Sequence, residues 1–165
     1  GVAAPTAVDA TAGLGEDSVL LAAAGFTVTL YERDPVIAAL LRDGLERAAN
    51  EPQLADAVGR MRPVEGDSVA GLRSLDFTPD VVFLDPMFPA RTKSAAVKKK
   101  FQLLHQLERP CADEAELLDA ALAAHPRKVV IKRPPKGAWL AGVKPSHSLT
   151  GKAVRYDVIV PPQVG

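Results

Sequence analysis

Short β-rich stretches alternate with helical stretches along this chain, and the alternation restricts the folds that the chain can adopt. The pattern predicts strands at residues 7–10, 26–31, 61–64, 81–84 and 128–131. It predicts helices at residues 16–24, 35–49, 94–107 and 112–124, and a loop over residues 50–60. Strands that alternate with helices form a mostly parallel sheet with helices on both faces, so we expect an α/β fold.

The end of the sequence departs from this alternation. Residues 146–150 and 153–160 are β-rich and are separated by Gly151 and Lys152, which predicts a hairpin. Because a hairpin adds strands without a crossover helix, we expect at least one strand to run antiparallel to the others.

Length and composition fit one globular domain over residues 1–165. The chain is 47% hydrophobic, and no apolar run reaches the roughly 20 residues that a membrane span needs. Cys111 is the single cysteine and the three histidines are scattered, so we expect neither disulfides nor a metal site. These features predict a cytoplasmic, metal-free protein that does not enter membranes.

Charge divides the chain into two halves. Residues 1–85 carry six basic and 14 acidic side chains, a net charge of −8. Residues 86–165 carry 14 basic and six acidic side chains, a net charge of +8. Such a division is typical of an acidic ligand site beside a basic nucleic-acid surface, but ordinary variation in surface charge gives the same numbers.

A glycine loop follows the first predicted strand. Gly13 and Gly15 would allow a tight turn and the close approach of a ligand, although a purely structural turn has the same composition. Glu16 and Asp17 fill the first turn of the next helix and would repel a pyrophosphate. Ser18 stands where a dinucleotide-binding loop has its third glycine, so a ligand without phosphate fits better than NAD.

S-adenosyl-L-methionine is such a ligand, because it carries a sulfonium and an ammonium group and no phosphate. Asp9, Asp17 and Asp85 could balance its positive charges. Asp9 and Asp85 stand at or just beyond the ends of predicted strands, where open α/β sheets bind their ligands, and Asp17 stands in the first turn of the helix that follows the glycine loop.

Two further polar positions suit the rest of such a cofactor. Glu32 ends the second predicted strand and could accept hydrogen bonds from both ribose hydroxyls. Asp67 or Ser68 follows the third strand and could bond the adenine amine, but an ordinary turn would use the same residues.

A rigid polar loop, Asp85-Pro86-Met87-Phe88-Pro89, follows the apolar strand expected at 81–84. The Asp85 carboxylate and the Pro86 carbonyl could accept both N–H bonds of an exocyclic amine, which would raise its nucleophilicity and aim it at an electrophile. Phe88 could stack on the nucleobase that carries the amine. The alternative is a proline-rich turn with Phe88 in the core.

These motifs together resemble a known family. The strings that carry the resemblance are Asp9-Ala10-Thr11-Ala12-Gly13-Leu14-Gly15, Leu30-Tyr31-Glu32-Arg33, Leu84-Asp85-Pro86-Met87-Phe88-Pro89, Lys93-Ser94-Ala95, Val97-Lys98-Lys99 and Lys132-Arg133-Pro134. They are similar to the RsmJ family of bacterial small-subunit ribosomal RNA guanine-N2 methyltransferases, which are class I S-adenosylmethionine-dependent enzymes. The resemblance runs from Val8 to about Asp157.

The resemblance implies a Rossmann-like, seven-stranded methyltransferase sheet and methylation of one guanosine in 16S ribosomal RNA, either naked or in the small subunit. The positions that match the family's cofactor contacts are Glu16, Asp17, Glu32, Arg33, Asp67, Ser68 and Asp85. Glu16 replaces a residue that is commonly basic, and Asp67 replaces a small polar one. Family members also have an N-terminal portion that we expect to be absent from this chain.

Basic residues follow both the loop at residues 85–89 and the last predicted parallel strand. We expect RNA contacts from Lys93, Lys98, Lys99, Lys132 and Arg133. Lys132 and Arg133 come directly after the strand at 128–131, so they should emerge at the ligand end of the sheet. Phosphate contacts there would give salt-dependent affinity for RNA, whereas Lys98 and Lys99 also fit a solvated helix face.

Three other functions compete with RNA methylation. The same cofactor could serve DNA adenine or a glutamine in protein; the charge division favours nucleic acid, and only the family strings favour RNA. An NAD-dependent oxidoreductase is opposed by the acidic first turn and by the lack of a Tyr-x-x-x-Lys pair. A non-enzymatic RNA-binding module would not need an acid-lined glycine loop.

Overall fold

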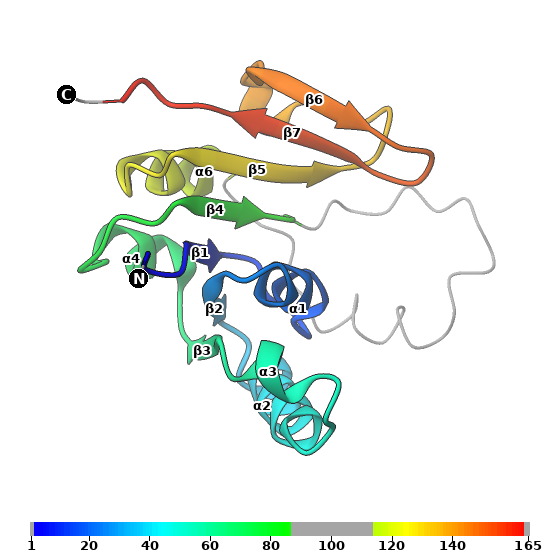
Figure 1. Cartoon of the computed structure of the whole chain (residues 1–165). Helices are drawn as coiled ribbons and strands as arrows, with labels where there is room; N and C mark the ends of the chain where they lie inside the picture. The colour runs from blue at the N-terminus through cyan, green and yellow to red at the C-terminus, as the bar shows by residue number, and fades with distance from the viewer. Residues whose placement is uncertain (1, 87–113, 164–165) are drawn as a thin grey trace.

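The computed structural model describes residues 2–86 and 114–163, and one sheet runs through them (Figure 1). Within these residues the sheet has seven strands in the order β3-β2-β1-β4-β5-β7-β6. The strands are β1 (Thr6–Asp9), β2 (Thr27–Glu32), β3 (Met61–Glu65), β4 (Val81–Leu84), β5 (Lys128–Arg133), β6 (His147–Thr150) and β7 (Arg155–Ile159). The first five are parallel, whereas β7 is antiparallel to β5 and β6 to β7. The predicted α/β sheet with a closing hairpin is confirmed.

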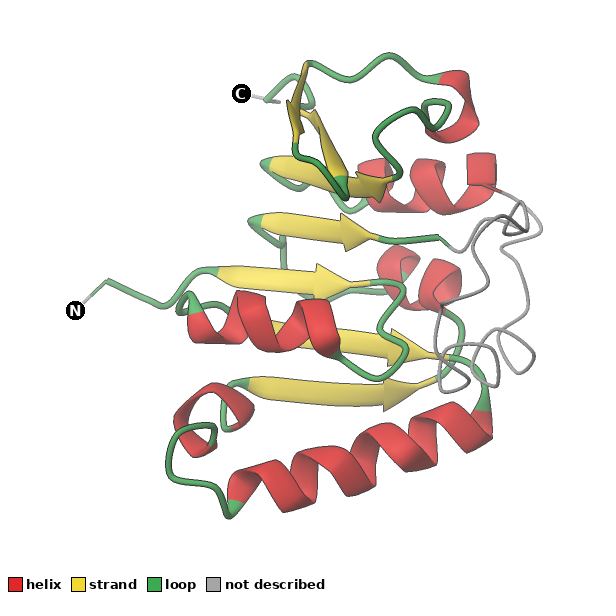
Figure 2. Ribbon diagram, turned by 90° about the vertical axis from the view of Figure 1, so that its right-hand side faces the viewer, coloured by secondary structure: helices red, strands yellow, loops and turns green. Residues whose placement is uncertain are grey.

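Helices cover both faces of the sheet (Figure 2). The described helices are α1 (Glu16–Ala23), α2 (Pro35–Ala49), α3 (Ala55–Val58), α4 (Ser68–Arg73), α6 (Glu114–Ala123) and the 3-10 helix η1 (Leu140–Gly142). The first three pack on one face, and α4, α6 and η1 pack on the other. Asp34 caps α2 as its sequence predicts, accepting hydrogen bonds from two backbone N–H groups of the first turn.

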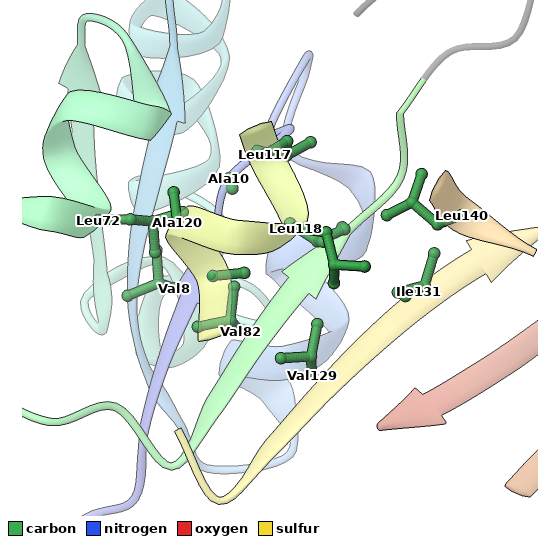
Figure 3. Close-up of a cluster of buried hydrophobic side chains, with 12 residues drawn as sticks. Val8, Ala10, Leu72, Val82, Leu117, Leu118, Ala120, Val129, Ile131 and Leu140 are labelled. Carbon is green, nitrogen blue, oxygen red and sulfur yellow. The ribbon is translucent and has the colours of Figure 1, made fainter. Parts of the chain in front are cut away.

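Alternation along the strands divides the core into two layers. Ala7 and Val8 are neighbours on β1, but Ala7 packs with α1 and α2 while Val8 packs with α4 and α6. Figure 3 shows the second layer, where Leu117 and Leu118 of α6 belong to the same buried cluster as Val82 of β4 and Val129 of β5. Burial of each such side chain contributes about 1.5–3 kcal/mol, so the two layers hold the sheet as a rigid platform for its loops.

Two short α-helices were not expected from the sequence. The loop predicted over residues 50–60 contains α3, and the turn expected near Asp67 begins α4. Gly71 lies inside α4, where the ring of Tyr31 packs so closely that a Cβ on Gly71 would overlap it. Tertiary packing, rather than helical periodicity, therefore stabilises α4. The helix predicted over residues 94–107 lies outside the described residues.

The strand order creates a switch point between β1 and β4. From β1 the chain proceeds to β2 and β3 on one side, whereas β4 and β5 lie on the other. The loops that follow β1 and β4 are adjacent, because the Ala10 N–H donates to the Phe83 carbonyl over 3.1 Å. In open α/β sheets such a switch point is where ligands bind.

Candidate active site

The glycine loop adopts a backbone conformation that suits glycine. Gly13 has φ of 53° and Gly15 has φ of 79°, both in the left-handed region. A Cβ on Gly15 would lie 2.9 Å from the Cδ1 atom of Leu41 on α2. Both predicted glycines are therefore needed for the turn, and Gly15 also for the packing of the turn against α2.

Glu32 connects the end of β2 to this loop. Its Oε2 accepts the Gly13 N–H over 3.1 Å, and its Oε1 accepts the Asp34 N–H over 2.9 Å. A carboxylate has about four lone-pair sites, so Glu32 can accept further hydrogen bonds from a ligand hydroxyl.

Asp9 lies beneath the loop and not on its surface. Only 1% of the residue is exposed. Its Oδ1 accepts the Thr11 N–H over 3.0 Å, and its Oδ2 accepts the Ser18 hydroxyl over 2.6 Å. Burial raises the pKa of Asp9 to about 6, against the hydrogen bonds from Ser18 and Thr11, which lower it. The predicted direct contact with a cofactor is corrected: Asp9 orders the loop from below.

Thr11 joins the two loops at the switch point. Its hydroxyl accepts the backbone N–H of Asp85 over 2.6 Å and lies 3.4 Å from the Oδ1 of Asp9. Thr11 was not among the residues predicted for the site. The Asp-x-Thr spacing is a signal for a local turn, but the bond to Asp85 follows only from the adjacency of β1 and β4.

Asp85 belongs to a charged cluster contributed by three elements. The Nζ of Lys132, on β5, lies 3.4 Å from the Oδ2 of Asp85 and 3.2 Å from both carboxylate oxygens of Asp17, on α1. Burial raises the pKa of Asp85, and Lys132 reduces that effect without cancelling it. Burial alone would lower the pKa of Lys132, but Asp85 and Asp17 outweigh burial and raise it.

Arg133 is not a surface residue, and its predicted RNA contact is wrong. Only 2% of it is exposed. Its Nε donates to the Ala138 carbonyl over 2.8 Å, and its Nη1 lies 3.9 Å from a carboxylate oxygen of Glu114 on α6. Strand β5 continues to Arg133, so Lys132 and Arg133 face opposite sides of the sheet. Arg133 therefore anchors the β5–β6 connection to α6.

The other predicted cofactor residues lie around the same edge. Asp67 caps α4 by accepting the N–H groups of Val69 and Ala70, and Ser68 begins that helix. Glu16 is exposed in the first turn of α1, and Arg33 is exposed just after β2. With Gly13, Gly15, Asp17, Glu32 and Asp85, these residues follow the carboxyl ends of β1, β2, β3 and β4.

Pro86 is buried directly after Asp85. Phe88, Lys93, Lys98 and Lys99 lie outside the described residues, so their roles stay predictions. Within residues 2–86 and 114–163, no group of three or more His, Cys, Asp or Glu side chains could hold a metal ion. Nor does this part of the chain contain a helix that is both long and apolar enough to cross a membrane.

A family model described as "Putative SAM-dependent methyltransferase" matches residues 1–161. The chain belongs to this family. The family is named for its dependence on S-adenosylmethionine, which is the cofactor that the acidic glycine loop predicted. The sequence-based expectation of a methyltransferase is therefore confirmed at the level of the family.

Curated relatives carry a more specific name. The chain is 52% identical over 158 residues to the ribosomal RNA small subunit methyltransferase J of Thioalkalivibrio sulfidiphilus, covering 94% of this chain and 62% of the relative. It is 50% identical over 159 residues to the protein of the same name from Aeromonas salmonicida, covering 96% of this chain and 64% of the relative. The chain thus spans less than two thirds of the length of these relatives.

A solved structure supports the fold. The crystal structure of a SAM-dependent methyltransferase from Neisseria gonorrhoeae superposes with a TM-score of 0.80 at 38% sequence identity. The match covers 98% of this chain and 63% of that chain. The Rossmann-like methyltransferase fold expected from the resemblance is confirmed.

Proposed function

We propose that this chain transfers a methyl group from S-adenosylmethionine to the N2 amine of one guanosine in 16S ribosomal RNA, in the cytoplasm. The observation that carries the proposal is the position of Asp85 at the switch point, where its N–H is held by Thr11 of the glycine loop over 2.6 Å. The acid that we propose to hold the amine thus adjoins the loop that we propose to bind the cofactor. The names of the relatives support the RNA substrate and the small subunit as partner.

The described residues fit the cofactor. Both glycines adopt left-handed conformations, and Asp17, Glu32 and Asp85 supply carboxylates without any phosphate-binding arrangement. When bound, the cofactor supplies a methyl group on a positively charged sulfur. Glu32 would bind the ribose hydroxyls, and Asp17 would balance the positive charge. We include Glu16, Arg33, Asp67 and Ser68 as further contacts, the last two with the adenine.

Asp85 would act on the amine without being a strong base. Its carboxylate would accept one N–H bond and the Pro86 carbonyl the other, which would orient the nitrogen lone pair. As the amine gains its methyl group it must lose a proton, and the carboxylate of Asp85 is placed to accept it. In this proposal Phe88 would stack on the guanine.

A methyl-transfer assay tests the proposal. The chain is incubated with radiolabelled S-adenosylmethionine and small ribosomal subunits from a strain that lacks the activity, and the modified base is mapped. We expect one labelled guanosine, modified at N2. Label on DNA adenine or on a protein glutamine, with none on the subunit, would instead support the other amino-methyltransferase functions.

Cofactor binding has its own test at Glu32. We expect Glu32→Ala to weaken binding of S-adenosylmethionine by about 10- to 100-fold, because hydrogen bonds to a charged group contribute about 1.5–3 kcal/mol. Isothermal titration calorimetry measures the affinity, with the exposed Glu46→Ala on α2 as control. Equal affinities of the Glu32 variant and the unaltered chain would remove this residue from the cofactor site.

With Arg133 buried, RNA contacts at this edge would come from other basic residues. Thr150 pairs with Arg155, and Arg155 pairs with Arg133, so the hairpin turn lies beside the carboxyl end of β5. Lys152 is exposed in that turn, and Lys136 is exposed just after β5. We therefore propose Lys136 and Lys152 as phosphate contacts.

Reversing both charges should weaken binding to the small subunit. We expect Lys136→Glu with Lys152→Glu to reduce affinity by about tenfold or more at moderate salt and to flatten its salt dependence. The matched control is Arg127→Glu with Lys128→Glu, at the opposite end of β5. If both pairs bind alike, RNA does not approach from this edge.

A further inference from the structure

The side chain of Lys132 lies between two carboxylates that are distant from it in the sequence. Alternation along β5 turns its side chain toward α1, while Arg133 turns toward α6. The ammonium group therefore meets carboxylates from two other elements, with Asp17 at 3.2 Å and Asp85 at 3.4 Å. Its side chain is 27% exposed, so the contacts are partly shielded from solvent.

We propose that Lys132 is a positioning residue for methyl transfer, which holds the Asp85 carboxylate in its ionised form and in place for the amine. This inference rests on the proposed function, because it assumes that Asp85 binds the amine. A single ammonium has three donors, so Lys132 can hold Asp85 and Asp17 at once.

The charges around Asp85 make such a residue necessary. Asp9 on β1 and Asp17 on α1 are both acidic, and each disfavours a second negative charge nearby. Burial disfavours the ionised form of Asp85 as well. Among the described residues, Lys132 contributes most to keeping Asp85 ionised, and Arg133 on the far face of β5 contributes less.

Loss of the ammonium should therefore act through Asp85. The carboxyl would hold its proton to a higher pH, and the neutral form is a weaker acceptor for the amine. The affinity for the cofactor should not fall, because removing a positive charge next to a positively charged ligand relieves repulsion. A merely structural ion pair between β5 and α1 would instead weaken both steps.

The test compares Lys132→Met with Lys132→Arg and the control Lys128→Met, which removes a charge from the other end of β5. We expect the acid limb of the pH–kcat profile to move up by about one pH unit or more in Lys132→Met. On the acid limb itself kcat should therefore fall about tenfold, with no loss of affinity for S-adenosylmethionine. Lys132→Arg should restore most of the activity, and Lys128→Met should match the unaltered chain.

A second measurement does not require turnover. Carbon-13 NMR titration of Asp85 should show its pKa raised further in Lys132→Met, with Lys132→Gln as the substitute if the methionine variant does not fold. An unchanged Asp85 titration and an unmoved acid limb would overturn the role of Lys132. If the unaltered chain methylates no RNA, the proposed function fails, but the titration still tests the coupling of Lys132 to Asp85.

Discussion

Replacing Asp85 with alanine should reduce methyl transfer to the small subunit by about 100-fold or more. The guanine N2 amine is conjugated with the purine ring, so its lone pair is poorly available without an acceptor for its N–H bonds. Alanine removes that acceptor and the group placed to receive the proton. A radiolabelled transfer assay under single-turnover conditions measures the loss.

The fold should survive this substitution. The backbone N–H of Asp85, not its side chain, joins β4 to the glycine loop through Thr11. Burial raises the pKa of the carboxyl, so the ionised side chain is a cost to folding and its removal is tolerated. Asp119→Ala, an exposed acid on α6, is the control. Turnover by Asp85→Ala comparable to that of the control would exclude the catalytic role.

The sequence predicted the strands and the start of helix α2 better than the segments that connect the strands. The expected strand at 81–84 matches β4, and Asp34 starts α2 as its capping position indicated. Local signals suffice there, because an apolar run and an N-cap need no distant partner. Helix α4 was missed because it is short and contains Gly71, and its stability depends on contact with Tyr31.

For the site, the sequence named candidate residues but could not predict how they pair. Lys132 and Arg133 were both expected at an RNA-facing rim because the strand was expected to stop at residue 131. The strand continues to residue 133, so its alternation directs one side chain into the site and the other into the interior. Which carboxylates Lys132 meets depends on the order of strands, and no local pattern encodes that.

The buried carboxylate of Asp9 should make the stability of the chain depend on pH. Its pKa rises from 3.8 to about 6 on folding, so the folded state prefers the protonated form. The associated stabilisation is complete below pH 3.8 and is lost as the pH rises through about 6. The full loss corresponds to about 3 kcal/mol of unfolding free energy.

Asp9→Asn should remove this contribution while keeping the loop. The amide oxygen can still accept the Thr11 N–H, and the Ser18 hydroxyl can rotate to accept from the amide nitrogen. Denaturant unfolding at several pH values should show the variant gaining stability relative to the unaltered chain as the pH rises from about 4 to about 7. Asp119→Asn should show no such gain. The contrary outcome is a difference in unfolding free energy between Asp9→Asn and the unaltered chain that stays constant across that range. Asp9 would then already be ionised in the folded state at acid pH, because the hydrogen bonds from Thr11 and Ser18 would outweigh its burial.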